Sequence, residues 1–243
     1  MADVTGIALF LFAVLMTVSV SEAKKRKVKN SNDRTVQTAP REPSAEVPAP
    51  PVNQHISGSS DNTVTDSRRH TVKTMRMVRI GNKTWMAENL DFKTGNSWCY
   101  EDSSSNCAKY GRLYDWNTAK KACPSGWRLP AREDWDNLAQ AVGGRKNSEH
   151  SGIQWDGAGR NLKSKSGWGG KGSGADTHGF SALPGGYRNA GGAFDAAGTS
   201  GYWWTASKDD NGAYHRGLFH DDNDLSEDVI FESFGYSVRC VRD

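Results

Sequence analysis

Hydrophobic residues recur along the chain with two different periods, and each period predicts a different element. Between Ala131 and Val142, apolar residues occur at i, i+3, i+4 and i+7, the spacing of one helical face, namely Trp135, Leu138, Ala139 and Val142. We expect this helix to end at Gly143-Gly144, because glycine commonly follows the last helical turn. A shorter helix is expected from Tyr114 to Ala122, since Pro124 prevents its continuation.

Alternation of apolar and polar residues predicts strands near both ends of the globular part. The segment from Met77 to Ala87 alternates around Gly81-Asn82, a turn-forming dipeptide, and so predicts a β-hairpin. Three later strands are expected at Tyr202–Ser207, Ala213–Phe219 and Tyr236–Val241. Two short helices with short antiparallel strands place the expected fold in the α+β class.

Between Gly143 and Gly192 neither period persists, and glycine becomes frequent. This composition predicts a long, loop-dominated region held down by isolated aromatic residues. Trp155, Trp168 and Tyr202 lie in or beside these glycine-rich loops. Other tryptophans fall in expected helices, strands or motifs and are assigned to the core: Trp85, Trp116, Trp127, Trp135, Trp203 and Trp204.

The first 77 residues have the composition of an export signal followed by a spacer. Residues 6–20 form an apolar run of signal-peptide length, shorter than the ~20 residues that span a bilayer, and Ser21-Glu22-Ala23 offers small residues for cleavage. We therefore expect residues 1–23 to be a signal peptide, residues 24–77 a disordered, basic, proline-containing linker, and residues 78–243 the domain. An uncleaved anchor is the alternative, because no Lys or Arg precedes the run and four basic residues, 24–27, follow it.

The net charge of +3 is distributed unevenly along the 243 residues. Residues 24–77 contain eleven Lys or Arg against five acids, so the basic character belongs to the linker, and residues 78–243 sum to −1. A domain close to neutrality is not expected to present a continuous basic face, and nucleic acid is excluded as the expected partner.

Four cysteines, Cys99, Cys107, Cys123 and Cys240, indicate disulfides if the chain is exported. An even number of cysteines is typical of a disulfide framework, although four cysteines permit three pairings. Zinc is the disfavoured alternative, since no Cys-x-x-Cys or paired Cys/His spacing occurs.

Four segments together carry a resemblance to one family. They read IGNKTWMAENLDF at residues 80–92, ACPSGWRLP at 122–130, GFSALPGGYR at 179–188 and GYSVRC at 235–240. They are similar to the hallmarks of the Fibrobacter succinogenes major paralogous domain family of bacterial surface and secreted proteins. The order of elements also resembles the C-type-lectin-like folds. The resemblance implies a secreted or cell-surface location, and disulfides that join Cys99 to Cys107 and Cys123 to Cys240.

The segment from Arg128 to Trp135 also resembles the formylglycine-generating enzymes, which share a related fold. Their oxidation chemistry needs a reactive cysteine pair near the C-terminus, where this chain has only Cys240. The likeness therefore implies shared architecture, with Trp135 in the core and Arg128 against a carboxylate or a backbone group. The histidines are scattered, and no nucleophile elbow or P-loop occurs, so no catalytic set is found and an enzyme is not expected.

Binding is the expected function of a domain of this kind. Exported proteins stack aromatic side chains on sugar rings, so Trp155, Trp168 and Tyr202 are the candidate ligand-binding residues. No cofactor is required, and the ion considered is calcium, which prefers oxygen ligands such as those of Asp221, Asp222, Asn223 and Asp224. The alternative for this cluster is an acidic turn on a solvated hairpin.

The expected partner is a polysaccharide or another surface protein. The alternative function is that of a structural subunit of an extracellular assembly, in which copies of the chain associate with one another. Contact with a membrane is expected only through the signal segment or through attachment to the cell surface.

Overall fold

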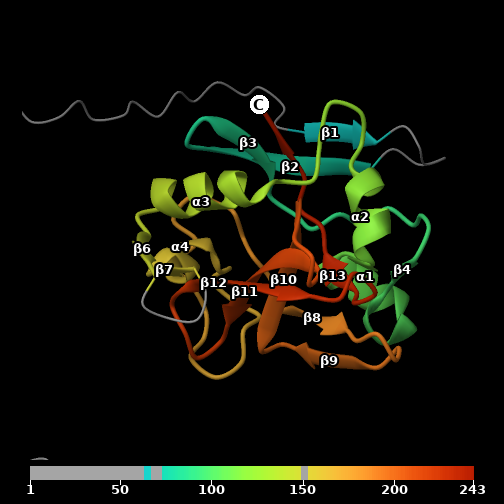
Figure 1. Ribbon diagram of the computed structural model, residues 1–243. Helices are drawn as coiled ribbons and strands as arrows, with labels where there is room; N and C mark the ends of the chain where they lie inside the picture. The colour runs from blue at the N-terminus through green and yellow to red at the C-terminus, as the bar shows by residue number, and fades with distance from the viewer. Residues whose placement is uncertain (1–62, 67–72, 149–152) are drawn as a thin grey trace, which may run out of the picture. The chain divides into compact units, whose positions relative to one another are not determined.

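The computed structural model describes residues 63–66, 73–148 and 153–243 (Figure 1). The expected signal peptide and most of the expected linker lie outside these residues. The described residues form two β-sheets, four α-helices and one 3-10 helix, so the fold is α+β and mostly β, with two helices more than expected. None of the helices in these ranges has the length and apolar character needed to cross a membrane.

The smaller sheet has the strand order β1 (Thr63–Asp66), β2 (Lys73–Ile80), β3 (Lys83–Met86) and β14 (Val241–Arg242), with all pairs antiparallel. β2 and β3 are the predicted hairpin. The folded unit extends further toward the N-terminus than the expected boundary at residue 78, because β2 begins at Lys73 and Met75 is buried. That part of β2 resembled linker in the sequence since polar residues alternate with its methionines.

Two predicted strands are confirmed as β10 (Ser200–Lys208) and β11 (Ala213–Phe219). They lie at the centre of the larger sheet. Next to them lie β12 (Leu225–Ile230) on one side and β13 (Tyr236–Ser237) on the other. The outer strands are β4 (Ser97–Trp98), β5 (Leu113–Tyr114), β6 (Arg145–Asn147) and β7 (Gln154–Asp156), while β8 (Gly185–Arg188) pairs with β10 and with β9 (Phe194–Ala197).

The prediction of one strand over Tyr236–Val241 is wrong, because two short strands occupy it and belong to different sheets. β13 lies in the larger sheet and β14 in the smaller one. Between them Val238 and Cys240 accept backbone hydrogen bonds from Leu90 (2.8 Å) and Met86 (3.1 Å). The crossing segment is thus buried and hydrogen-bonded, which makes its composition look like that of a continuous strand.

The two predicted helices are confirmed as α2 (Trp116–Ala122) and α3 (Arg132–Ala141). Arg128 makes the expected carboxylate contact, since its Nη2 donates to Asp134 Oδ1 at 2.9 Å. Short helices also form where no helix was expected, namely η1 (Tyr100–Asp102), α1 (Ser104–Tyr110) and α4 (Ala158–Leu162). Only Cys107 and Tyr110 of α1 are buried, so the sequence shows no apolar stripe that would predict this helix.

Helix α3 lies between the two sheets, and its Trp135 is the centre of an aromatic core. The Trp135 ring centroid lies 5.1 Å from that of Trp85 on β3 and 6.3 Å from that of Trp203 on β10. The ring centroid of Phe180, the fourth member of the cluster, lies 5.9 Å from that of Trp135. All six tryptophans assigned to the core from the sequence are buried.

Both disulfides have the pairing that the family resemblance implied. Cys99 is bonded to Cys107, eight residues away, and Cys123 at the end of α2 is bonded to Cys240, 117 residues away. Two disulfides are typical of an oxidising environment outside the cytoplasm.

Candidate functional site

The two loop tryptophans predicted to bind a ligand lie in the core. Trp155 is 6% exposed and Trp168 is 5% exposed. The indole Nε1 of Trp168 donates to the Ala182 carbonyl at 3.0 Å, and that of Trp155 donates to Asp136 Oδ1 at 3.1 Å. The prediction that these rings are displayed for stacking on sugars is therefore wrong.

The glycines around these tryptophans explain the difference. They allow the loops to fold directly onto neighbouring backbone, which covers the rings. A Cβ atom at Gly174 would lie 2.2 Å from the Lys163 carbonyl oxygen, and one at Gly172 would lie 2.4 Å from that of His220. The glycine-rich composition thus reflects close packing of the loops.

The acidic turn predicted to bind calcium is hydrogen-bonded to its own surroundings. Asp224 accepts from the Gly157 backbone N–H and from Gln154 Nε2, each at 2.7 Å. Asp222 Oδ1 accepts from the Asp224 backbone N–H at 3.0 Å. Asp221 and Asn223 are exposed at the same turn.

A buried lysine already supplies positive charge to this turn. Lys163 is 1% exposed, and its Nζ donates to the carbonyls of Asp222 (2.6 Å) and Phe219 (2.9 Å). Burial lowers the pKa of Lys163, while the charges of Asp222 and Asp221 oppose that shift. Within the described ranges no three His, Cys, Asp or Glu side chains are grouped to hold a metal ion. Calcium binding at residues 221–224 stays a prediction, and the Asp222 carbonyl at this turn already accepts a hydrogen bond from Lys163 Nζ.

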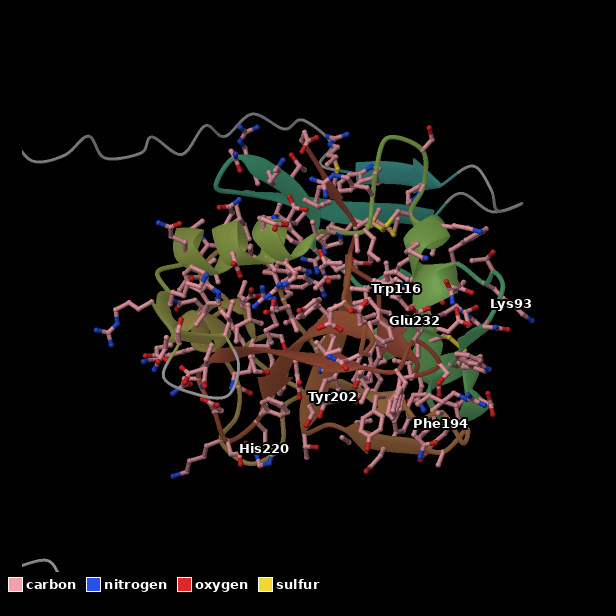
Figure 2. The ribbon with its side chains drawn as sticks, in the orientation of Figure 1. Lys93, Trp116, Phe194, Tyr202, His220 and Glu232 are labelled. Atoms are coloured by element: carbon pink, nitrogen blue, oxygen red, sulfur yellow. A yellow bond between two sulfur atoms is a disulfide. The ribbon has the colours of Figure 1, made fainter. Side chains whose placement is uncertain are left out.

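Tyr202, the third predicted residue, lies on a partly accessible aromatic surface of the larger sheet. Its ring is stacked on Tyr236 with a centroid distance of 5.0 Å and an interplanar angle of 15°. Tyr187 and Phe219 contact it edge-on at 5.5 Å and 5.8 Å. We call these four residues, Tyr187, Tyr202, Phe219 and Tyr236, the tyrosine face. Figure 2 shows Tyr202 on the β8–β9 side of the sheet, away from α3.

Strand alternation and one glycine build the tyrosine face. Along β10, Tyr202 projects to one side of the sheet, whereas Trp203 projects to the other side and packs against α3. Gly217 lies opposite Tyr202 on β11. A Cβ atom at Gly217 would come within 3.1 Å of the Phe219 ring, so the glycine makes room for that ring to lean across β11 toward Tyr202.

His215 lies beside these rings and is uncharged at neutral pH. It is 6% exposed, and its ring centroid is 4.8 Å from that of Tyr236. Burial lowers the pKa of His215 to about 4, although the charge of Asp228 opposes the shift. Its Nδ1 atom is buried and has no hydrogen-bond partner among the described residues.

The hydroxyl groups of the tyrosine face stay protonated, and two aspartates flank them. Burial is the main cause that raises the pKa of Tyr202 and of Tyr236. Asp195 on β9 accepts a hydrogen bond from the Tyr187 hydroxyl at 3.3 Å. Asp228 lies opposite His215 in the β11–β12 register and is exposed. The surface therefore combines apolar ring faces with hydroxyl donors and carboxylate acceptors.

The model of the Fibrobacter succinogenes major domain matches residues 78–242. The chain belongs to this family. Neither the curated proteins nor the solved structures compared with the chain gave a match. The matched part of this Fibrobacter succinogenes major domain contains the whole tyrosine face and both disulfides, and the family description names a domain and no activity.

A pocket of this Fibrobacter succinogenes major domain is lined in part by a residue that holds core elements together. The cavity, about 330 Å³, lies between the end of β3 and α1, with Arg76, Glu88 and Lys109 in its lining. Asn89 forms part of the lining, but its Oδ1 accepts from Trp203 Nε1 (2.9 Å) and Arg239 Nη2 (2.7 Å). Because Asn89 joins core elements to one another, the tyrosine face is the better candidate for ligand binding.

The sequence singled out one residue of the tyrosine face and missed the others. Tyr202 was found because it adjoins the glycine-rich loops. Tyr187 belongs to the GFSALPGGYR segment and Tyr236 to GYSVRC, so both were in segments recognised for a different reason. The alternation of strand residues could have placed Tyr202 on one side of its strand, but not the neighbours it meets there.

Proposed function

We propose that this domain is a secreted or surface-displayed, non-catalytic binding module of C-type-lectin-like fold that holds a carbohydrate on the tyrosine face. The observation that carries the proposal is the half-buried Tyr202 ring, surrounded by three further aromatic rings from β8, β11 and β13. The two disulfides support an exported location. The mixture of helices, antiparallel strands and long loops supports the lectin-like fold.

The chemistry of the tyrosine face suits a sugar. The apolar C–H face of a pyranose stacks on an aromatic ring, and its hydroxyl groups need donors and acceptors at the rim of that ring. Tyrosine combines a large apolar surface with a polar tip, so one side chain can serve both purposes. Asp195 and Asp228 add acceptors at the edge of the surface.

A structural subunit of an extracellular assembly, or a module that binds a surface protein, is the second candidate. Phe231 is 67% exposed, which makes it the large apolar side chain most open to solvent in the described ranges. It lies beside a hollow of about 380 Å³ that Lys208, Asp209, Asp210 and Glu232 also line. Aromatic residues, phenylalanine included, are enriched at protein–protein interfaces relative to the rest of the surface.

A glycan array probed with the full chain and two variants tests these candidates. Tyr202→Leu keeps an apolar side chain but removes the ring and the hydroxyl, whereas Phe231→Ala removes an exposed aromatic ring that is not one of the four residues of the tyrosine face. We expect the wild type and Phe231→Ala to retain the same glycans and Tyr202→Leu to lose them. Absence of glycan binding, together with self-association in sedimentation that Phe231→Ala abolishes, would favour the assembly subunit instead.

A further inference from the structure

The charged side chains on the tyrosine face are acidic. Asp195 is exposed and pairs with Tyr187 across the β8–β9 hairpin. Asp228 is exposed and lies directly opposite His215, so that both side chains project to the Tyr202 side of the sheet. Asp228 Oδ1 accepts from the Val229 backbone N–H at 2.7 Å, and its Oδ2 makes no hydrogen bond within the described part of the chain.

The neighbouring cations project away from the tyrosine face. Arg188 follows Tyr187 on β8 and so projects to the opposite side, where its guanidinium lies 4.2 Å from the Trp98 ring centroid. Arg216 follows His215 on β11 and is buried on the α3 side, where its Nη2 bonds Asp136 (2.6 Å) and Glu227 (2.7 Å). His215 itself is neutral at pH 7.

The carboxylates at the rim and the aromatic rings at the centre of the tyrosine face both attract a positively charged ligand. The face of an aromatic ring is electronegative and attracts a cation within about 6 Å of its centroid. Two carboxylates beside such rings add to that attraction, and they repel anionic ligands. The charges of Asp195 and Asp228 also contribute, after burial, to the raised pKa of Tyr202 and Tyr236 respectively.

We propose that the tyrosine face prefers a polysaccharide with free, protonated amino groups over its neutral and acidic counterparts. This inference rests on the proposed carbohydrate-binding function and specifies the class of sugar. A sugar is favoured over a lysine side chain because the other three rings already contact Tyr202, with centroids 5.0 to 5.8 Å from its own. These contacts leave no slot beside Tyr202 for an extended side chain, whereas a pyranose stacks its C–H face on a ring without entering between rings.

Titration calorimetry with two matched ligands tests the proposal. The first ligand is a glucosamine hexamer with free amines, the second is the same hexamer with every amine acetylated, and both are titrated into the full chain at pH 5.5 and constant low ionic strength. We expect the amine form to bind roughly tenfold more tightly, as one cation–π contact supported by carboxylates would provide. Equal or tighter binding of the acetylated form would overturn the proposal.

Variants separate this proposal from the underlying function. Asp195→Asn and Asp228→Asn together should abolish most of the tenfold preference, so that the variant binds the two hexamers with similar affinity. The control Asp210→Asn removes an exposed carboxylate from the β10–β11 turn and should preserve the preference. A preference that survives the double substitution would overturn the proposal.

Three further outcomes are also decisive. If neither hexamer binds while the glycan array retains other sugars, the amino-sugar proposal is wrong and the carbohydrate-binding function stands. If the array retains no glycan, or if Tyr202→Leu binds both hexamers as the wild type does, carbohydrate binding on the tyrosine face itself fails. If hexalysine binds more tightly than the free-amine hexamer and loses that binding in Tyr202→Leu, the site recognises a basic protein segment, and the proposal of an amino sugar is wrong.

Discussion

At the scale of single residues, His215 is held in its neutral form by the protein around it. Burial lowers its pKa to about 4 in the folded chain, whereas the pKa of histidine in an unfolded chain is about 6.5. Between these two values the unfolded chain binds more protons than the folded chain. The free energy of unfolding therefore falls as the pH falls through this window.

Acidification from pH 7 to pH 5 is expected to reduce the free energy of unfolding by about 2 kcal/mol through this residue alone. Urea denaturation at the two pH values measures the loss. His215→Gln removes the titrating group and should remove that part of the pH dependence, while His178→Gln, at an exposed position, should keep it. Equal pH dependence in the wild type and His215→Gln would contradict the expectation.

Trp168 provides a second prediction at this scale. Because its ring is buried and its Nε1 bonds the Ala182 carbonyl, Trp168→Ala should lower the free energy of unfolding by about 3 to 5 kcal/mol. Phe231→Ala should stay within about 0.5 kcal/mol of the wild type, since that ring is largely in solvent. Chemical denaturation of both variants gives the comparison. If the Trp168→Ala protein is as stable as the wild type, Trp168 is not a core residue and is again a candidate for ligand binding.

Nothing in the local sequence shows which of Trp168 and Tyr202 is accessible to a ligand. Each adjoins glycine, and each lies in or near a region without helical or strand periodicity. Their difference comes from residues far along the chain, since Ala182 and Ser164 enclose Trp168, whereas Tyr202 meets Tyr187 and Tyr236 at a partly open surface. Which side chain a ligand can reach was therefore decided by tertiary packing.

At the scale of elements, helices and strands with a regular spacing of apolar residues were predicted correctly, and those without such a spacing were missed. The apolar stripe of α3 and the turn at Gly81 were read correctly because each depends on residues close together in the sequence. Helix α1 was missed because its anchor is a disulfide to Cys99 outside the helix. The division of the last predicted strand into β13 and β14 was missed because two separate sheets receive them.

The two disulfides should differ in their effect on stability. The bond between Cys123 and Cys240 closes a loop 117 residues long, and its removal by paired Cys→Ser substitution should cost about 4 to 5 kcal/mol from chain entropy. Paired substitution of Cys99 and Cys107, eight residues apart, should cost about 2 to 3 kcal/mol. Thermal and urea unfolding of the two double variants measures the difference. Equal losses would argue against loop entropy as the main contribution.

At the scale of the whole domain, the smaller sheet and the larger sheet share one core. Trp85 from the smaller sheet contacts Trp135 of α3, which in turn contacts Trp203 of the larger sheet. Met75 on β2 belongs to a second buried cluster, which includes Trp204 of the larger sheet. Residues that precede the family match at 78 thus contribute to the folded unit.

Met75→Ala in the full chain tests this shared core. We expect a loss of about 2 to 5 kcal/mol, the usual cost of removing a buried methionine side chain. The loss should appear as a shift of one cooperative transition, identical by far-ultraviolet circular dichroism and by tryptophan fluorescence. Arg79→Ala, at an exposed position of the same strand, should leave the transition in place. An early, separate transition in Met75→Ala would show that the smaller sheet unfolds independently.

The position of β14 has a consequence for how the protein is made. This strand lies beside β3, pairing Val241 with Trp85, so the smaller sheet joins the β2–β3 hairpin near the start of the domain to its last strand. A growing chain emerges in sequence order, and the hairpin must wait without β14 while more than 150 residues are added (about 8 to 30 s at 5 to 20 residues per second). The smaller sheet thus cannot be completed until Val241 has been synthesised, whatever the rest of the domain has folded by then.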